Sequence, residues 1–90
     1  MRELELWSFA VLEAEIEQLI RQGLPQAEVR VSTVDGTHFD ALIVTEEFAD
    51  KRPLVRHQMV YATLGKRLGR EIHALSVHAL TPDEWRRTST

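Results

Sequence analysis

The sequence contains no cysteine, and this absence excludes several kinds of site. Without a thiol, the 90-residue chain cannot form a disulfide, supply a thiolate nucleophile or bind zinc or an iron–sulfur cluster through cysteines of its own. Its longest apolar runs, 9–12 and 41–44, are far shorter than the roughly 18 residues that span a bilayer. The N-terminal segment lacks a signal-peptide core, so we expect a cytoplasmic protein with no membrane role.

Acidic side chains are missing from residues 51 to 70, although the first fifty residues contain eleven Asp and Glu against three Arg. The net charge is −3, so the chain is polarised rather than basic overall. This pattern is typical of a solvated helix face, or of a docking surface for an acidic partner or phosphates. The six basic residues of this stretch are Lys51, Arg52, Arg56, Lys66, Arg67 and Arg70.

The hydrophobic pattern predicts one compact α/β domain, of the α+β type, in the order α-β-β-α-β-α. Ser8 is expected to cap a helix that continues to about residue 22 and stops at Gly23. Two strands, 28–34 and 39–45, are joined by a turn at Asp35-Gly36 and predict an antiparallel hairpin. We expect residues 1–7 to form a lead-in and residues 8–87 the domain.

The second half of the chain predicts a helix, a strand and a short final helix. Pro53 suits the start of a helix that runs to about Leu68 and ends at Gly69. Residues 72–79 alternate as a strand, with Leu75, Val77 and Ala79 on the same face as His73. The segment 81–84, Thr-Pro-Asp-Glu, predicts a capping box at the last helix. Residues 86–90 suggest a frayed end, with 88–90 as the tail.

Five segments resemble the BolA family and occur in the same order. They are Gly-Thr-His-Phe at 36–39, Ile-Val-Thr-Glu-Glu-Phe at 43–48, Leu-Val-Arg-His-Gln-Met-Val-Tyr at 54–61, Ile-His-Ala-Leu-Ser-Val at 72–77 and Thr-Pro-Asp-Glu-Trp at 81–85. Each segment is weakly specific alone, but five in register over roughly residues 12–87 are specific. The 56–61 motif and the short hairpin connection look most like the YrbA-type bacterial branch.

The resemblance implies a fold like the class II KH domain, with helices packed on a three-stranded sheet. It implies a partner, a monothiol glutaredoxin, and a [2Fe-2S] cluster that bridges the two proteins with a glutathione thiol. The expected roles are iron–sulfur cluster trafficking or iron regulation. Some bacterial members of the family are also DNA-binding transcriptional regulators, and the helix-turn-helix-like part of the fold matches the basic stretch.

The histidines are the candidate ligands, because imidazole replaces cysteine on one iron of Rieske clusters. The face shared with Leu75 and Val77 is typical of a structural His73, whereas the resemblance implies that His73 is the C-terminal cluster ligand. The family's second ligand lies in the first hairpin loop, where His38 is the soft-ligand candidate. A structural role for His38, a ligand elsewhere and Asp35 as a poorer oxygen donor remain alternatives.

Two functional hypotheses follow, and neither is enzymatic, because no serine has a nucleophile-elbow context. In the first, the chain is an adaptor that shares a cluster through His73 and His38, with Lys66, Arg67 and Arg70 docking the partner. Alone, it is expected to hold the cluster poorly and to be a monomer or weak homodimer. In the second, all six basic residues contact DNA phosphates. We expect His57 to be a packing residue and His78 an ordinary surface or sheet-packing residue.

Overall fold

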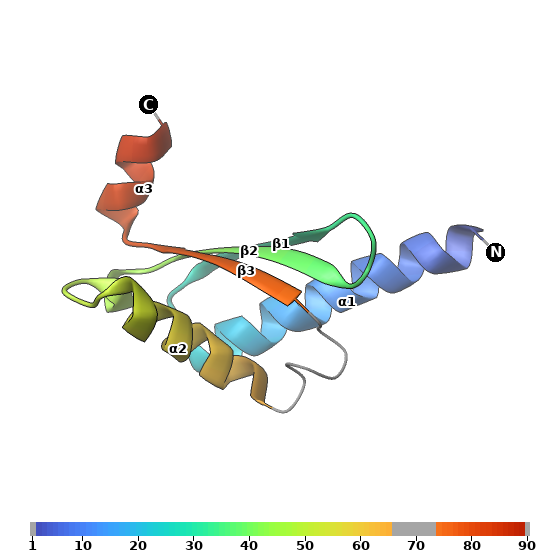
Figure 1. The fold of residues 1–90 in the computed structure, drawn as a ribbon, viewed down its shortest axis with the longest axis horizontal. Coiled ribbons are helices and arrows are strands. Elements are labelled where there is room, and N and C mark those ends of the chain that lie inside the picture. The colour runs from blue at the N-terminus through green and yellow to red at the C-terminus, as the bar shows by residue number, and fades with distance from the viewer. Residues whose placement is uncertain (1, 66–73, 90) are drawn as a thin grey trace.

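The computed structural model describes residues 2–65 and 74–89 of the chain. A long helix, α1, precedes a hairpin, and α2 then connects the hairpin to a last strand and helix (Figure 1). The elements are α1 (Arg2–Gly23), β1 (Glu28–Thr33), β2 (His38–Val44), the 3-10 turn η1 (Glu46–Phe48), α2 (Pro53–Leu64), β3 (Ala74–Leu80) and α3 (Pro82–Ser89). This α+β architecture confirms the predicted order.

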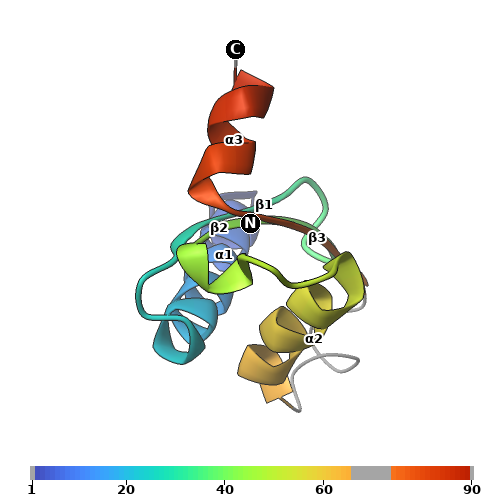
Figure 2. The same cartoon turned by 90° about the vertical axis from the view of Figure 1, so that its left-hand side faces the viewer.

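The three strands form one sheet in the order β1-β2-β3. β1 and β2 pair antiparallel, from Glu28 opposite Val44 to Thr33 opposite Phe39, which confirms the predicted hairpin. β2 and β3 pair parallel, from His38 beside Ala74 to Val44 beside Leu80. Figure 2 shows that α1 and α2 cover one face of the sheet, while α3 projects from the other side.

The core lies between the sheet and the two long helices. Alternation in β2 turns Phe39, Ala41 and Ile43 toward the helices, where all three are buried. Ile20 of α1 and Val60 of α2 are fully buried against them. On β3, Leu75, Val77 and Ala79 belong to this core or pack against it, as the alternation predicts.

The structure corrects several predicted helix ends. α1 begins at Arg2, so Ser8 lies inside the helix and is not its N-cap. Gly23 is still helical, and a Cβ there would lie 2.4 Å from Cγ2 of Thr63, so the glycine permits close approach of α1 and α2. α2 ends at Leu64, because Gly65 has a positive φ of 56°. The α-helix thus ends before the predicted Leu68 and Gly69, which lie outside the described residues.

The strands and the final helix also differ slightly from expectation. β1 ends at Thr33 and β2 begins at His38, one residue earlier in each case than predicted. α3 continues to Ser89, so residues 86–89 are helical rather than frayed. The predicted start of the last strand, at residues 72 and 73, lies outside the described part of the chain. No helix within 2–65 and 74–89 is long and apolar enough to cross a membrane.

Side chains of α1 bind the outer edge of β1. The Glu13 Oε2 atom accepts from the backbone N–H of Thr33 at 2.8 Å, and Glu17 Oε1 accepts from the Val31 N–H at 3.3 Å. Arg21 Nη2 donates to the Val29 carbonyl at 3.4 Å. Residues four positions apart on a helix are separated by about 6 Å, and residues two positions apart on a strand by about 7 Å. Because these spacings nearly match, successive turns of α1 reach successive outward-facing residues of β1. These contacts block a strand edge that would otherwise be open to pairing.

A largely buried arginine connects the end of the sheet to two other segments. The Arg56 side chain, 11% exposed, donates from Nη1 to the Ala79 carbonyl at 3.0 Å and to Glu84 Oε1 at 2.7 Å. Its Nε donates to the Lys51 carbonyl at 2.8 Å, and its guanidinium lies 5.8 Å from the centre of the Phe48 ring. Arg56 therefore joins the segment before α2 to the end of β3 and to α3.

The first turn of α3 has the predicted capping box. The Thr81 hydroxyl accepts from the Glu84 N–H at 3.2 Å, while Glu84 Oε1 accepts from the Thr81 N–H at 2.8 Å. Hydrogen bonding to Arg56, followed by that to Thr81, lowers the pKa of Glu84 to about 2. One carboxylate thus serves both the helix cap and the arginine.

Candidate functional site

The β1–β2 loop is a tight turn that fixes His38 at the first residue of β2. Gly36 adopts a positive φ of 81°, which favours glycine. The Thr33 hydroxyl accepts from the Gly36 N–H at 2.9 Å and donates to the His38 carbonyl at 2.7 Å. The Thr33 side chain thereby bridges the two ends of the loop. These local hydrogen bonds fix the backbone position of His38.

The Asp35 carboxylate makes three hydrogen bonds within this loop. Its Oδ1 atom accepts from the backbone N–H groups of Thr37 and His38, both at 2.9 Å. Its Oδ2 atom lies 2.7 Å from Nδ1 of the His38 ring, and the Thr37 hydroxyl lies 3.2 Å from the same nitrogen. The backbone hydrogen bonds from His38 and Thr37, then the His38 ring, hold the pKa of the Asp35 carboxyl well below its usual range. Asp35 is therefore a carboxylate near neutral pH.

The imidazole of His38 is open to a partner. Its side chain is 72% exposed and that of Asp35 is 51% exposed. Nδ1 is engaged with Asp35, so Nε2 is the ring nitrogen left for an external ligand. The arrangement is the carboxylate–histidine pair that commonly supports metal-bound histidines.

The sheet register brings the start of β3 beside this loop. His38 pairs with Ala74, the first residue of β3. His73, the predicted C-terminal ligand, directly precedes Ala74 in the sequence and lies outside the described residues. The parallel pairing of β2 and β3 therefore places Ala74, the first described residue of β3, beside His38.

The other two histidines lie where the sequence predicted them. His57 of α2 is half-buried, and its ring meets that of Tyr61 edge-on at 6.3 Å between centroids. His78 is exposed on the sheet face opposite the core, opposite Leu42 in the register. His57 and His78 are thus a packing residue and a surface residue.

The six residues of the predicted basic surface differ in exposure, in their contacts and in whether the structure describes them. Lys51 and Arg52 are exposed just before α2. The guanidinium of Arg56 is committed to contacts within the chain. Lys66, Arg67 and Arg70 lie outside the described residues.

Lys51 and His38 lie near opposite ends of β3. Arg56 links Lys51 to Ala79, near the end of β3, whereas His38 lies beside Ala74 at its start. At about 3.3 Å per strand residue, five residues separate these points by roughly 17 Å. Lys51 and Arg52 therefore do not belong to the same surface as His38.

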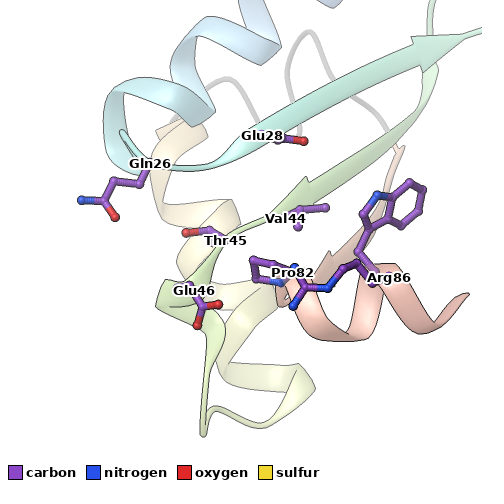
Figure 3. A pocket seen from close by; sticks show the side chains of 8 residues that line it. Gln26, Glu28, Val44, Thr45, Glu46, Pro82 and Arg86 are labelled. Atoms are coloured by element: carbon purple, nitrogen blue, oxygen red, sulfur yellow. The ribbon is translucent and has the colours of Figure 1, made fainter. Parts of the chain in front are cut away.

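A shallow pocket occupies the end of β2 that is remote from His38 (Figure 3). Its volume is about 390 Å³. It lies between the end of β2, the start of β1 and the helix α3, and it is lined by Gln26, Glu28, Val44, Thr45, Glu46, Pro82, Trp85 and Arg86. Its lining contains no histidine, so this hollow is not the predicted ligand site.

The described residues around His38 supply one candidate metal ligand rather than a complete metal site. Within the described ranges, no three His, Cys, Asp or Glu side chains converge as a metal site. An imidazole is an established ligand of [2Fe-2S] iron, and this one is exposed and has its second nitrogen hydrogen-bonded. The donor chemistry at His38 therefore suits one ligand of a cluster whose other ligands come from elsewhere.

The sequence showed the histidine but missed its supporting residue. Asp35 entered only as a substitute ligand, whereas in the structure it is the hydrogen-bond partner of the His38 ring. The signal was present in Asp-Gly-Thr-His, because an Asp at the start of a turn commonly binds the backbone two or three residues later. The pairing of Arg56 with Glu84 had no such signal, because the two residues are 28 positions apart.

The fold and site define a small α+β domain that presents a histidine at a sheet end. A family model, "BolA-like protein", matches residues 10–84. The chain belongs to the BolA-like family.

Relatives in this family share both sequence and structure with the chain. An uncharacterised protein from Acinetobacter guillouiae is 40% identical over 76 residues, covering 83% of this chain and 90% of that protein. The structure of a BolA homologue from Coxiella burnetii superposes with a TM-score of 0.74 at 39% identity, covering 82% of this chain and 95% of that one. The solution structure of mouse BolA1 gives a TM-score of 0.71 at 32% identity, covering 87% and 71%.

Three relatives, from Vibrio cholerae, Haemophilus influenzae and Escherichia coli, have a name that states a function. The Escherichia coli K12 protein called DNA-binding transcriptional regulator BolA is 41% identical over 49 residues. The match covers 54% of this chain and 47% of that protein, so it spans about half the length of each.

Proposed function

We propose that this chain is a non-enzymatic adaptor that binds a monothiol glutaredoxin and co-ligates a bridging [2Fe-2S] cluster through histidine. The glutaredoxin and a glutathione thiol supply the sulfur ligands, and His38 and His73 supply imidazole nitrogens. The protein then serves cytoplasmic iron–sulfur trafficking or iron regulation. The observation that carries the proposal is the exposed His38 ring, held by Asp35 at the sheet end where β3 begins.

This chain's own residues place one imidazole and leave room for a partner. The tight loop fixes the backbone of His38, and its side chain is exposed and accessible to a partner. The bound cluster supplies electron-transfer or iron–sulfur delivery chemistry. Mixed imidazole and thiolate ligation gives it a different electronic environment from an all-thiolate site.

The test is to mix the protein with a cluster-loaded monothiol glutaredoxin and record the visible circular dichroism. We expect wild type to change the spectrum, and His73→Ala and His38→Ala each to abolish or strongly reduce that change. The matched control is His78→Ala, which removes an exposed histidine from another part of the sheet and should behave as wild type. An unchanged spectrum with folded wild-type protein would refute the proposal.

DNA binding is the second candidate function. It is favoured by the name of the Escherichia coli relative and by the exposed Lys51 and Arg52 before α2. Because Arg56 binds groups within the chain, five of the six predicted basic residues remain for DNA. About five phosphate contacts give a slope of roughly −4.5 when the logarithm of the binding constant is plotted against the logarithm of the salt concentration. A gel shift should then weaken in Lys51→Ala/Arg52→Ala. No shift at low salt would exclude this function.

A further inference from the structure

We infer that Asp35 is a positioning residue that fixes the His38 imidazole as its Nδ1–H tautomer, so that Nε2 is the atom offered to a metal. The inference rests on the proposed function for its purpose. Beyond that function, it assigns a positioning role to Asp35, names Nε2 as the ligand atom and specifies which ring nitrogen carries the proton.

The geometry requires a proton between Asp35 and the ring. The Oδ2 atom of Asp35 and Nδ1 of His38 are 2.7 Å apart, which is a hydrogen-bond distance. An ionised carboxylate has only acceptors, so the hydrogen must come from the ring nitrogen. In a neutral imidazole the other nitrogen then carries a lone pair.

The backbone contacts of Asp35 fix which oxygen faces the ring. Oδ1 accepts two N–H groups, from Thr37 and His38, and this orients the carboxylate plane within the loop. Oδ2 is left to meet Nδ1. The Thr37 hydroxyl, 3.2 Å from Nδ1, accepts or donates and so adapts to either tautomer. Of the two groups beside Nδ1, only the Asp35 carboxylate always needs a hydrogen-bond donor.

This arrangement has a direct chemical consequence for a metal. A histidine that binds through Nε2 needs that nitrogen unprotonated, and a carboxylate on Nδ1–H both selects the tautomer and makes Nε2 more basic. Such supporting residues typically change metal affinity by about 10- to 100-fold when they are replaced. Asp35 would therefore prepare His38 before any partner arrives.

Asp35→Asn is the informative substitution because it reverses the hydrogen bond. The amide oxygen must stay at the Oδ1 position to accept the N–H groups of Thr37 and His38, which places the NH₂ group against Nδ1. The amide then donates, and the His38 proton moves to Nε2. Asp50→Asn is the matched control, because it removes the same charge at another exposed residue, whose φ of 63° an asparagine tolerates.

The experiment records ¹⁵N–¹H spectra of the imidazole nitrogens in the cluster-free protein, at a pH where His38 is neutral. His38→Ala assigns the signals, and far-ultraviolet circular dichroism checks that each variant is folded. We expect the Nδ1–H tautomer in wild type and Asp50→Asn, and the Nε2–H tautomer in Asp35→Asn. The same tautomer in wild type and Asp35→Asn, or Nε2–H in wild type, would overturn the inference.

A second measurement links the tautomer to the cluster and separates the two proposals. In a glutaredoxin titration followed by visible circular dichroism, Asp35→Asn should bind about 10- to 100-fold more weakly than wild type. Equal affinity would overturn a positioning role toward the cluster. If wild type shows the Nδ1–H tautomer but gives no spectral change with glutaredoxin, the proposed function fails while the tautomer assignment stands.

Discussion

Replacing Arg56 with methionine is expected to lower the free energy of unfolding by about 2–3 kcal/mol, because a buried side chain loses all its charged hydrogen bonds. Methionine keeps a long apolar stem but no donor for the carbonyls of Lys51 and Ala79. Urea denaturation at pH 7 measures the loss. The control is Arg52→Met, the same change at an exposed neighbour, which should stay within about 0.5 kcal/mol of wild type.

The pH dependence of this loss identifies the contribution of Glu84. Its pKa is about 2 in the folded protein, below its ordinary value of 4.5, chiefly because of the Arg56 hydrogen bond. A lowered pKa means that the folded carboxylate stabilises the protein above about pH 4.5, and that this contribution is lost as the pH falls toward 2. The difference between wild type and Arg56→Met should therefore shrink between pH 5 and pH 2.5. A constant difference would contradict a role for the Arg56–Glu84 pair.

Removing the two α1 carboxylates that cover β1 is expected to make the protein self-associate as concentration rises. In Glu13→Ala/Glu17→Ala, the N–H groups of Thr33 and Val31 lose their acceptors and the strand edge becomes available for pairing. The two lost hydrogen bonds should also lower the free energy of unfolding by about 2 kcal/mol. Sedimentation velocity over a range of concentrations measures the association.

Two further variants separate hydrogen bonding from charge. Glu13→Gln/Glu17→Gln retains side-chain acceptors for the strand, so it should remain closer to wild type than the double alanine. Glu46→Ala/Glu47→Ala removes two exposed carboxylates elsewhere and should not associate. Association of this control to the same extent would show that net charge, rather than the open edge, is responsible.

Local patterns predicted most of the fold because the relevant forces act over a few residues. The hairpin, the alternation in β3 and the capping box at Thr81 all depend on neighbours within two to six positions. The start of α1 was missed because Ser8 is a good cap by type, yet the helix continues N-terminally to Arg2. The end of α2 was misplaced because two glycines follow the apolar stripe, and Gly65 adopts the positive φ.

The candidate site was predicted only in part, since its support depends on side-chain direction. The family resemblance implied His38 as the second ligand, and the structure places this histidine at the first residue of β2 with its side chain 72% exposed. The Asp35 contact depends on which carboxylate oxygen the turn directs at the ring, which the sequence does not specify. The burial of Arg56 likewise depends on the first turn of α3, which brings Glu84 beside the arginine at the end of β3. A count of charges along the sequence does not show these partners.

The carboxylate shared by Arg56 and Thr81 links the surface charge of the protein to the integrity of α3. Glu84 Oε1 accepts from both the Arg56 guanidinium and the Thr81 N–H. The folded α3 therefore pairs the Arg56 charge with a carboxylate. An anion that captured Arg56 would have to displace Glu84 and would weaken the first turn of α3. A chain cut before Glu84 would leave the Arg56 charge without its carboxylate partner. The C-terminal helix thus sets how much positive charge the start of α2 displays.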